Sequence, residues 1–197
     1  MKTFKVFLTE LKRHNFLNIR DLSVDDARDY FASALNAMRY DIEKDFPDFD
    51  KNFNLAKKKV REANTPRKKM PVIKSADVMK FIKFIRSEGI KIKKEKVRAV
   101  NLIPMQNQMY LDNPIDAIRR YTLKGTLKFI TSDSHSIVSF DNWIMDGNHR
   151  WLLAILYNPS MNVQVYSVAL EHEELKNMMD DFTDGVTKRK RNEDFQF

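Results

Sequence analysis

The stretch SIVSFDNWIMDGNHRWLLAILYNP, residues 136–159, constrains the fold more than any other part of the chain. SIVSF and WIM are short apolar runs joined by Asp141-Asn142, a pattern that predicts two strands and a turn. The apolar run that follows is long enough for a helix over residues 148–157 and ends at Asn158-Pro159. The polar group between Asp146 and Arg150 therefore lies where a strand passes into a helix, either as a tight turn in a core or as a functional site.

Hydrophobic periodicity predicts the remaining elements. Helices are expected over residues 3–11, 23–38, 53–63, 77–88, 113–125 and 171–182, and short strands over 97–104, 127–130 and 163–168. Ser23 with Asp26 resembles a helix-capping pair, and Gly125 is expected to end its helix. The class indicated is α+β, with a small mixed sheet and helices, preceded by a helical N-terminal region.

We expect three parts of the chain. Residues 1–70 are predicted to be a helical N-terminal region that ends in the linker-like stretch NTPRKKMP. Residues 71–185 are predicted to form the α+β domain. Residues 186–197, which include the run KRKRNEDFQF, are expected to be a flexible basic tail because nothing in them favours ordering.

Composition excludes several classes of function. The chain has 197 residues, of which 43% are hydrophobic and 31% charged, as in a folded domain and not a disordered chain. It has no cysteine, which excludes disulfides, thiolate catalysis and cysteine-ligated zinc or iron–sulfur centres. No apolar run approaches the roughly 20 residues that span a bilayer, and the first residues lack the apolar centre of a signal peptide. We therefore expect a cytoplasmic protein with no membrane partner.

The net charge of +8 is concentrated in one part of the chain. Between Lys51 and Arg98 there are 17 Lys and Arg residues against four acids, a net charge of +13, so the rest of the chain carries −5. A basic block of this kind favours a polyanionic partner such as nucleic acid. The alternative is a solvated helix face, because the segment KIKKEKVR has no aromatic residues between its charges.

The polar group between strand and helix has the chemistry of an anion site. Gly147 allows a sharp turn and a close approach of a ligand to the backbone. The first amides of the helix are unpaired and carry the positive end of its dipole, and Arg150 adds a planar pair of donors for phosphate oxygens. His149 can donate to a phosphate or transfer a proton near neutral pH, whereas Asp146 could bind a metal ion or cap the helix. Each residue alone has a structural explanation, but four such groups within five positions favour a site.

The segment DGNHRWLLA resembles the D-G-x-H-R motif of the ParB/sulfiredoxin-like superfamily. Upstream, LIPMQNQMYLDNPIDAI is similar to that family's strand, Pro-x-Gln and helix, and IVSFDNWIMDGNHRW is similar to its pair of strands entering the motif. The resemblance extends from Val97 to Leu170 and has no counterpart in the helical N-terminal third.

This resemblance implies a phosphate-binding pocket formed by Gly147, Asn148, His149, Arg150, Pro104 and Gln106. It also implies a nucleotide, ATP or ADP, with Mg²⁺ as cofactors, Asp146 as the metal ligand, and Asp146 and His149 as the catalytic residues. A sulfiredoxin needs a cysteine just before the motif's histidine, where this chain has Asn148, so sulfinic-acid reduction is excluded. The arginine-rich motif and helix-turn-helix domain of partition proteins do not occur in the sequence, which disfavours chromosome partitioning.

Three functions remain from different classes. The first is an enzyme that binds a nucleotide or a nucleic-acid phosphate and catalyses phosphoryl transfer or phosphoester hydrolysis, as a kinase, NTPase or nuclease does. The second is non-catalytic nucleic-acid binding through the basic block. The third is an accessory protein whose N-terminal helices bind a protein partner. The motif favours the first, the charge distribution the second, and the apolar stripe of the N-terminal helices the third.

Overall fold

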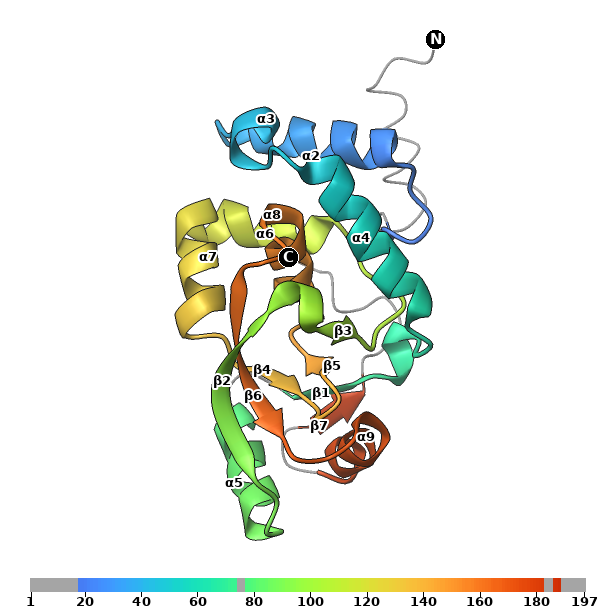
Figure 1. Ribbon diagram of the computed structural model, residues 1–197, viewed down its shortest axis with the longest axis vertical. Coiled ribbons are helices and arrows are strands. Elements are labelled where there is room, and N and C mark those ends of the chain that lie inside the picture. The colour runs from blue at the N-terminus through green and yellow to red at the C-terminus, as the bar shows by residue number, and fades with distance from the viewer. Residues whose placement is uncertain (1–17, 74–76, 183–185, 189–197) are drawn as a thin grey trace.

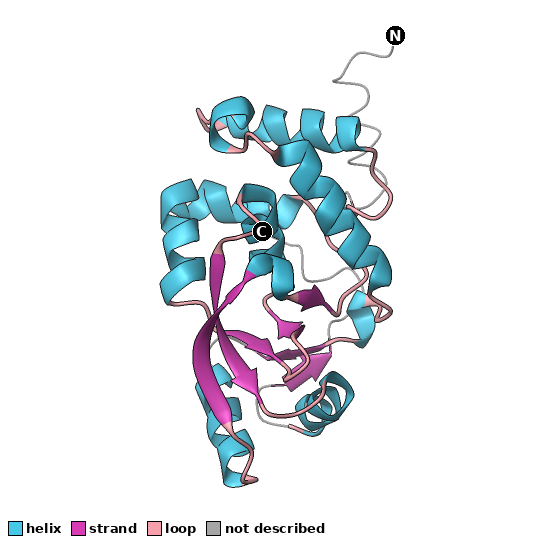
Figure 2. Cartoon of the chain, viewed as in Figure 1, coloured by secondary structure: helices cyan, strands magenta, loops and turns pink. Residues whose placement is uncertain are grey.

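The chain folds around a mixed sheet that has helices on both faces and a further layer of helices at one end (Figure 1). The computed structural model describes residues 18–73, 77–182 and 186–188. Strands lie in the lower half of the view and most of the helices in the upper half (Figure 2). The predicted α+β class is confirmed.

The main sheet has the strand order β2-β6-β4-β5-β3. Its strands are β2 (Ile92–Arg98), β3 (Ile103–Pro104), β4 (Ser136–Val138), β5 (Trp143–Asp146) and β6 (Asn162–Val168). The pairs β2–β6 and β4–β5 are antiparallel, whereas β4–β6 and β3–β5 are parallel. A separate antiparallel pair joins β1 (Pro71–Ile73) to β7 (Val186–Lys188). The main sheet is therefore mixed, with β2 and β3 at its two edges.

The sheet separates two hydrophobic clusters. The first is shared with α2 (Val24–Ala37), α3 (Ile42–Asp45), α4 (Phe49–Glu62), α6 (Asp112–Tyr121), α7 (Leu123–Ser132) and α8 (Asn148–Tyr157). The second is shared with α5 (Val78–Ser87) and α9 (His172–Asp181). Strand β6 gives Val163 and Val165 to the first cluster and Tyr166 and Val168 to the second, because successive side chains of a strand point to opposite faces. Both faces of the sheet are thus buried along its inner strands, whereas the edge strand β2 is largely exposed.

The N-terminal helices belong to the first cluster. Ser23 caps α2, as predicted, since its Oγ accepts a hydrogen bond from the Asp26 amide at 3.0 Å. Phe31 on α2 is fully buried between Phe46 and Phe49, with ring centroids 5.0 and 5.1 Å away. The apolar stripe that suggested a protein partner is, over the described residues, packed inside the chain, and the cluster is continuous across the expected boundary after residue 70.

Helix α4 is also tied to α8 by a polar contact. Asn52 Nδ2 donates to the carbonyl oxygen of Leu156 at 3.1 Å, and both residues are buried. The carbonyl groups in the last turn of a helix receive no hydrogen bond from an amide of the same helix. Here the side chain of Asn52 on α4 donates to one of them. The contact fixes the helical layer at one end of α8.

Two predictions in the middle of the chain are wrong. Residues 127–130, expected as a strand, lie inside α7, where Leu123, Leu127 and Ile130 follow helical and not strand spacing. Gly125 does not end a helix. The break occurs at Thr122, which has a φ of 61° and whose Oγ1 accepts a hydrogen bond from the Gly125 amide at 3.2 Å.

The strand expected over 97–104 is only partly correct. Strand β2 ends at Arg98, a 3₁₀ turn η3 (Ala99–Asn101) follows, and β3 is limited to Ile103–Pro104. The segment KIKKEKVR, considered as a helix face, is instead the edge strand β2. Pattern alone misplaced it because charged residues at an exposed sheet edge carry no clear period.

The segments at the expected boundaries are more ordered than predicted. The stretch taken as a linker contains a 3₁₀ turn η1 (Arg67–Lys69), and the Asn107 amide donates to the carbonyl oxygen of Thr65 at 3.0 Å. Residues 186–188, the start of the expected tail, form β7. The helix expected over 3–11 and the rest of the tail, 189–197, lie outside the described residues. Among the helices that are described, none has the length and apolar character to span a membrane.

The shared core predicts cooperative unfolding. We expect Phe31→Ala to lower the free energy of unfolding by about 3–5 kcal/mol, because it leaves a cavity between Phe46 and Phe49. Tryptophan fluorescence would report the loss, since Trp151 lies in the same cluster. Asp29→Ala, on an exposed position of the same helix, is the control. An unchanged fluorescence transition in Phe31→Ala would contradict a cluster shared by the N-terminal helices and α8.

Candidate functional site

Gly147 forms the turn between β5 and α8 and is the N-cap of α8. Its φ is 102°, a left-handed conformation that favours glycine. A Cβ atom at this position would lie 2.2 Å from Ser136 Oγ and 2.8 Å from Ser136 Cβ on the neighbouring strand β4. Glycine is therefore required twice, for its backbone angle and for the close approach of β4. The predicted strand, turn and helix are confirmed.

The first turn of α8 presents backbone amides that Gly147, having no side chain, cannot cap. Helical hydrogen bonding to the N-cap begins at Trp151, whose amide donates to the Gly147 carbonyl oxygen at 3.0 Å. The amides before it have no acceptor within the helix. Together with the helix dipole, they favour an anion at this end of α8.

A cavity of about 110 Å³ lies at this end of α8. It is lined by Met70, Pro71, Gln106, Met145, Asp146, Gly147, Asn148, His149 and Arg150. Six of the seven residues predicted as catalytic or phosphate-binding are in this lining. Pro104, which the resemblance also implied, is not, and is buried in β3.

Met70, Pro71 and Met145 line the cavity but were not predicted. Met70 and Pro71 belong to the stretch taken as a linker. An isolated β-bridge between Thr65 and Gln106 holds this stretch beside Gln106, so both segments line the cavity. No local pattern predicts such a pairing. Met145 could have been found, because it directly precedes Asp146 on the predicted strand.

Asp146 and Arg150 form an ion pair across the first turn of α8. Arg150 Nη2 lies 2.9 Å from Asp146 Oδ2, and both side chains are about three-quarters buried or more, with 27% and 19% exposed. The spacing of four residues suits such a pair on a helix face. An incoming anion would therefore compete with the Asp146 carboxylate for the guanidinium.

Asn148 is the most buried polar residue of the cavity after Gln106, with 5% of its surface exposed. Its Nδ2 donates to the Ile144 carbonyl oxygen at 3.3 Å, which fixes the orientation of the amide. Its Oδ1 is buried and has no hydrogen-bond partner among the described residues. Because a buried acceptor without a donor is costly, this atom favours a ligand or solvent molecule that donates to it.

The residues around the cavity do not form a metal site by themselves. Asp146 is the one carboxylate in the lining, and Arg150 already neutralises it. Within the described ranges there is no group of three or more His, Cys, Asp or Glu side chains that could hold a metal ion. The implied Mg²⁺ site is therefore not supported by the donor set.

The turn before β5 is held by a second polar cluster. Ser139 Oγ donates to Asp141 Oδ1 at 2.5 Å and His172 Nδ1 lies 2.5 Å from Asp141 Oδ2, while the Trp143 ring stacks on His172 at 4.8 Å. Burial acts to raise the pKa of the Asp141 carboxyl, but the hydrogen bonds from Ser139 and His172 outweigh it and hold that pKa below its usual range. The carboxylate lies between the hydroxyl and the imidazole, so the histidine cannot activate Ser139 as a nucleophile. The cluster fixes α9 to the strand that leads into the cavity.

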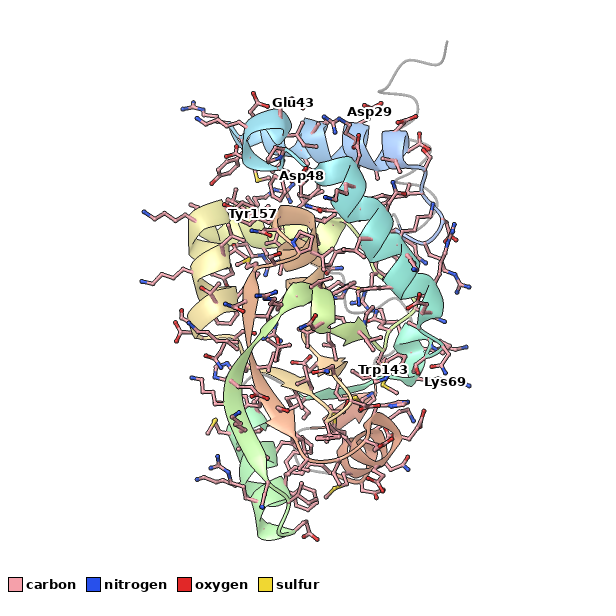
Figure 3. All side chains as sticks on the ribbon, in the orientation of Figure 1. Asp29, Glu43, Asp48, Lys69, Trp143 and Tyr157 are labelled. Carbon is pink, nitrogen blue, oxygen red and sulfur yellow. The ribbon has the colours of Figure 1, made fainter. Side chains whose placement is uncertain are left out.

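The basic block does not form one surface. Of the elements that carry it, α4 and η1 lie at the right of the view, whereas β2 and α5 lie at the left and lower left (Figure 1). Lys69, at the end of η1, lies close to Trp143 in the view, whereas the acids Asp29, Glu43 and Asp48 lie at the far end formed by the first helices (Figure 3). A polyanion that uses the whole block as one contact is therefore not favoured.

Comparisons with protein-family models, curated proteins and solved structures find no match for this chain.

The close approach at Gly147 can be tested against a second glycine. Gly147→Ala adds both a strained φ and a clash with Ser136, whereas Gly89→Ala adds only the strained φ of 77°, because nothing lies within 4 Å of its Cβ. We expect Gly89→Ala to cost roughly 1–2 kcal/mol of stability and Gly147→Ala at least about 1 kcal/mol more. Chemical denaturation of both variants measures the difference. Equal losses would show that β4 yields to the added methyl group.

The Asp141 cluster predicts a dependence of stability on pH. A carboxyl whose pKa is lowered on folding stabilises the native state above its unfolded pKa, near 4, and loses this effect as pH falls through the lowered native pKa. Asp141→Asn should therefore be less stable than the parent chain at pH 6, and the difference should shrink in acid. Denaturation at a series of pH values measures it, with the exposed Asp29→Asn as control. A difference that does not vary with pH would contradict the role of the charge.

Proposed function

We propose that the chain binds a phosphate group at the N-terminus of α8 and acts on it by phosphoryl transfer or phosphoester hydrolysis, as an enzyme of the ParB/sulfiredoxin-like type. The observation that most supports this is the shared cavity lining. Gln106 and the group from Asp146 to Arg150, far apart in sequence, meet at the uncapped end of a helix. Polar residues that met only by chance at the surface would not be expected to include a buried Asn148. They would also not be expected to include a glycine at a position where Ser136 of β4 leaves no room for a side chain.

The cavity has complementary roles for its polar groups. The first amides of α8 and the Arg150 guanidinium are donors for phosphate oxygens. Asn148 Oδ1 is an acceptor, so the ligand should also carry a donor, such as a protonated phosphate oxygen or a hydroxyl group. His149 lines the same cavity and is the candidate to move a proton to or from the reacting oxygen.

The size of the cavity bears on the ligand. At about 110 Å³ it is well below the roughly 300–1,000 Å³ of sites that enclose a small molecule. A phosphate group would enter and the rest of the ligand would remain outside. This is compatible with the end of a nucleotide such as ATP or ADP, and with a phosphate of a nucleic-acid strand.

The ion pair gives Asp146 a role that differs from metal binding. The carboxylate holds the guanidinium over the first turn of α8 and must give way, at least in part, when a phosphate binds. Asp146 therefore positions Arg150 and weakens the binding of anions. Removing its charge should strengthen ground-state binding of a phosphate, whereas a metal-binding Asp146 would make the same change weaken it.

Calorimetric titration with ATP and ADP, each with and without Mg²⁺, tests the proposal. We expect Arg150→Ala to lower the affinity by roughly one to two decades, because it removes a charge-assisted contact of about 1.5–3 kcal/mol. Arg150→Lys should restore it only in part, since an ammonium lacks the planar pair of donors. Asp146→Asn should bind more tightly than the parent chain.

Arg86→Ala is the matched control, because Arg86 is exposed on α5 and does not line the cavity. The melting temperature of each variant shows whether the fold is retained. Equal affinities of the parent chain and Arg150→Ala, for a nucleotide that the parent chain binds, would exclude a phosphate site at α8. Weaker binding of Asp146→Asn would contradict its competing role while leaving the site in place.

A further inference from the structure

The corner between α6 and α7 combines exposed rings with cations. We call the exposed side chains of Arg119, Arg120, Tyr121, Lys124, Lys128 and Phe129 the α6–α7 surface. Tyr121 exposes 67% of its surface and Phe129 exposes 41%. There is no acidic residue between Ala117 and Ser132. These cations lie outside the basic block that dominates the charge of the sequence.

Only some of the cations of this surface form ion pairs within the described part of the chain. Arg119 pairs with Asp116 on its own helix. Lys124 and Lys128 have no ion pair among the described residues, and they are one helical turn apart on the same face of α7. The other acid at the end of this segment is Asp133, which follows α7. The central part of the surface is therefore positive.

The corner is held rigid by hydrogen bonds. Thr126 Oγ1 donates to the Ala117 carbonyl oxygen at 3.1 Å and so ties α7 to α6. The Leu123 amide donates to the hydroxyl of Tyr40 at 3.0 Å, which fixes the start of α7 against the N-terminal helices. Tyr121 and Phe129 thus project from a fixed frame and not from a mobile loop. A partner therefore does not have to order the backbone that carries these rings when it binds.

An ordinary solvated helix face would not need exposed rings. The charged surfaces of α4 and β2 carry no large exposed aromatic residue among those described, and the one large apolar residue exposed on α5 is Met79. Large rings left in water beside unpaired lysines are the combination that binds single-stranded nucleic acid, where bases stack on rings and cations contact phosphates. A duplex offers its phosphates but keeps its bases stacked on each other.

We propose that the α6–α7 surface binds single-stranded nucleic acid. Tyr121 and Phe129 stack on bases, and Lys124 and Lys128 contact the phosphates between them. The site lies on the side of the molecule away from α4 (Figure 1). It does not depend on the phosphate site at α8, and either can be present without the other.

Fluorescence anisotropy with a labelled single-stranded oligonucleotide and the matching duplex tests this proposal. We expect the full chain to bind the single strand more tightly than the duplex. Tyr121→Ala with Phe129→Ala should weaken single-strand binding by roughly fivefold or more for each ring. Phe140→Ala, which removes a ring that is 71% exposed on the β4–β5 turn, is the aromatic control and should have little effect.

A charge-matched pair separates a local contact from net charge. Lys124→Glu with Lys128→Glu changes the net charge as much as Lys51→Glu with Lys58→Glu, both exposed on α4. Only the first pair should weaken binding strongly. It should also reduce the dependence of log affinity on log salt concentration by about 0.7 for each lost phosphate contact.

Three results would overturn the proposal. The first is no binding of the single strand at low salt by the parent chain. The second is equal weakening by the two lysine pairs, which would mean that net charge alone drives binding. The third is binding of the duplex at least as tight as that of the single strand, with no effect of the two rings. Melting temperatures of all variants confirm that each is folded, and nucleotide titrations of the same variants keep the α8 site distinguishable.

Discussion

The burial of α8 is the constraint on which most of this structure depends. Its residues from Trp151 to Leu156 are all buried, and α4, α6, α7 and the turn η3 pack around it. Trp151 Nε1 donates to the Ala99 carbonyl oxygen at 2.9 Å, so the helix also holds the backbone just before β3. A helix that is apolar on all sides can lie only in the middle of a fold. Among the N-terminal helices, α4 supplies part of the cover that α8 needs.

This central position explains why the candidate site lies at one end of the helix. The sides of α8 are occupied by apolar contacts, so polar groups are accommodated only where the helix begins. There the chain must also turn from β5 beside β4, and the proximity of Ser136 leaves room for no side chain at Gly147. The same steric restriction exposes the backbone amides of the first turn. The close approach of Ser136 to Gly147 thus accounts both for the packing of β4 and for the exposed amides that favour an anion.

The elements that sequence reasoning located best are those with a local signal. Strand β5, the turn at Gly147 and helix α8 follow from apolar runs interrupted by one polar group. The elements that were misplaced have sequences that fit more than one kind of secondary structure. Residues 127–130 are apolar and β-branched in part, but continuity with Leu123 makes them helical. The linker-like stretch before β1 reads as loop because its anchors, Thr65 to Gln106 and β1 to β7, are pairings between distant segments. Such pairings leave no trace in any local pattern.

The same reasoning applies to the site. Its polar residues were predicted because they are consecutive, and Gln106 because of its place in a resembling segment. The pairing of Asp146 with Arg150 was not predicted, although a separation of four residues on a helix permits it. In the structure the two residues therefore form one ion pair and not two separate charges.

The two edge strands of the main sheet limit how this chain can meet copies of itself. β2 carries exposed lysines at Lys93, Lys94 and Lys96, and β3 is two residues long and ends in Pro104, which has no amide hydrogen to donate. Strands of a neighbouring molecule would meet like charges at one edge and a missing donor at the other. Both features disfavour edge-to-edge pairing of this sheet with a second copy of the chain.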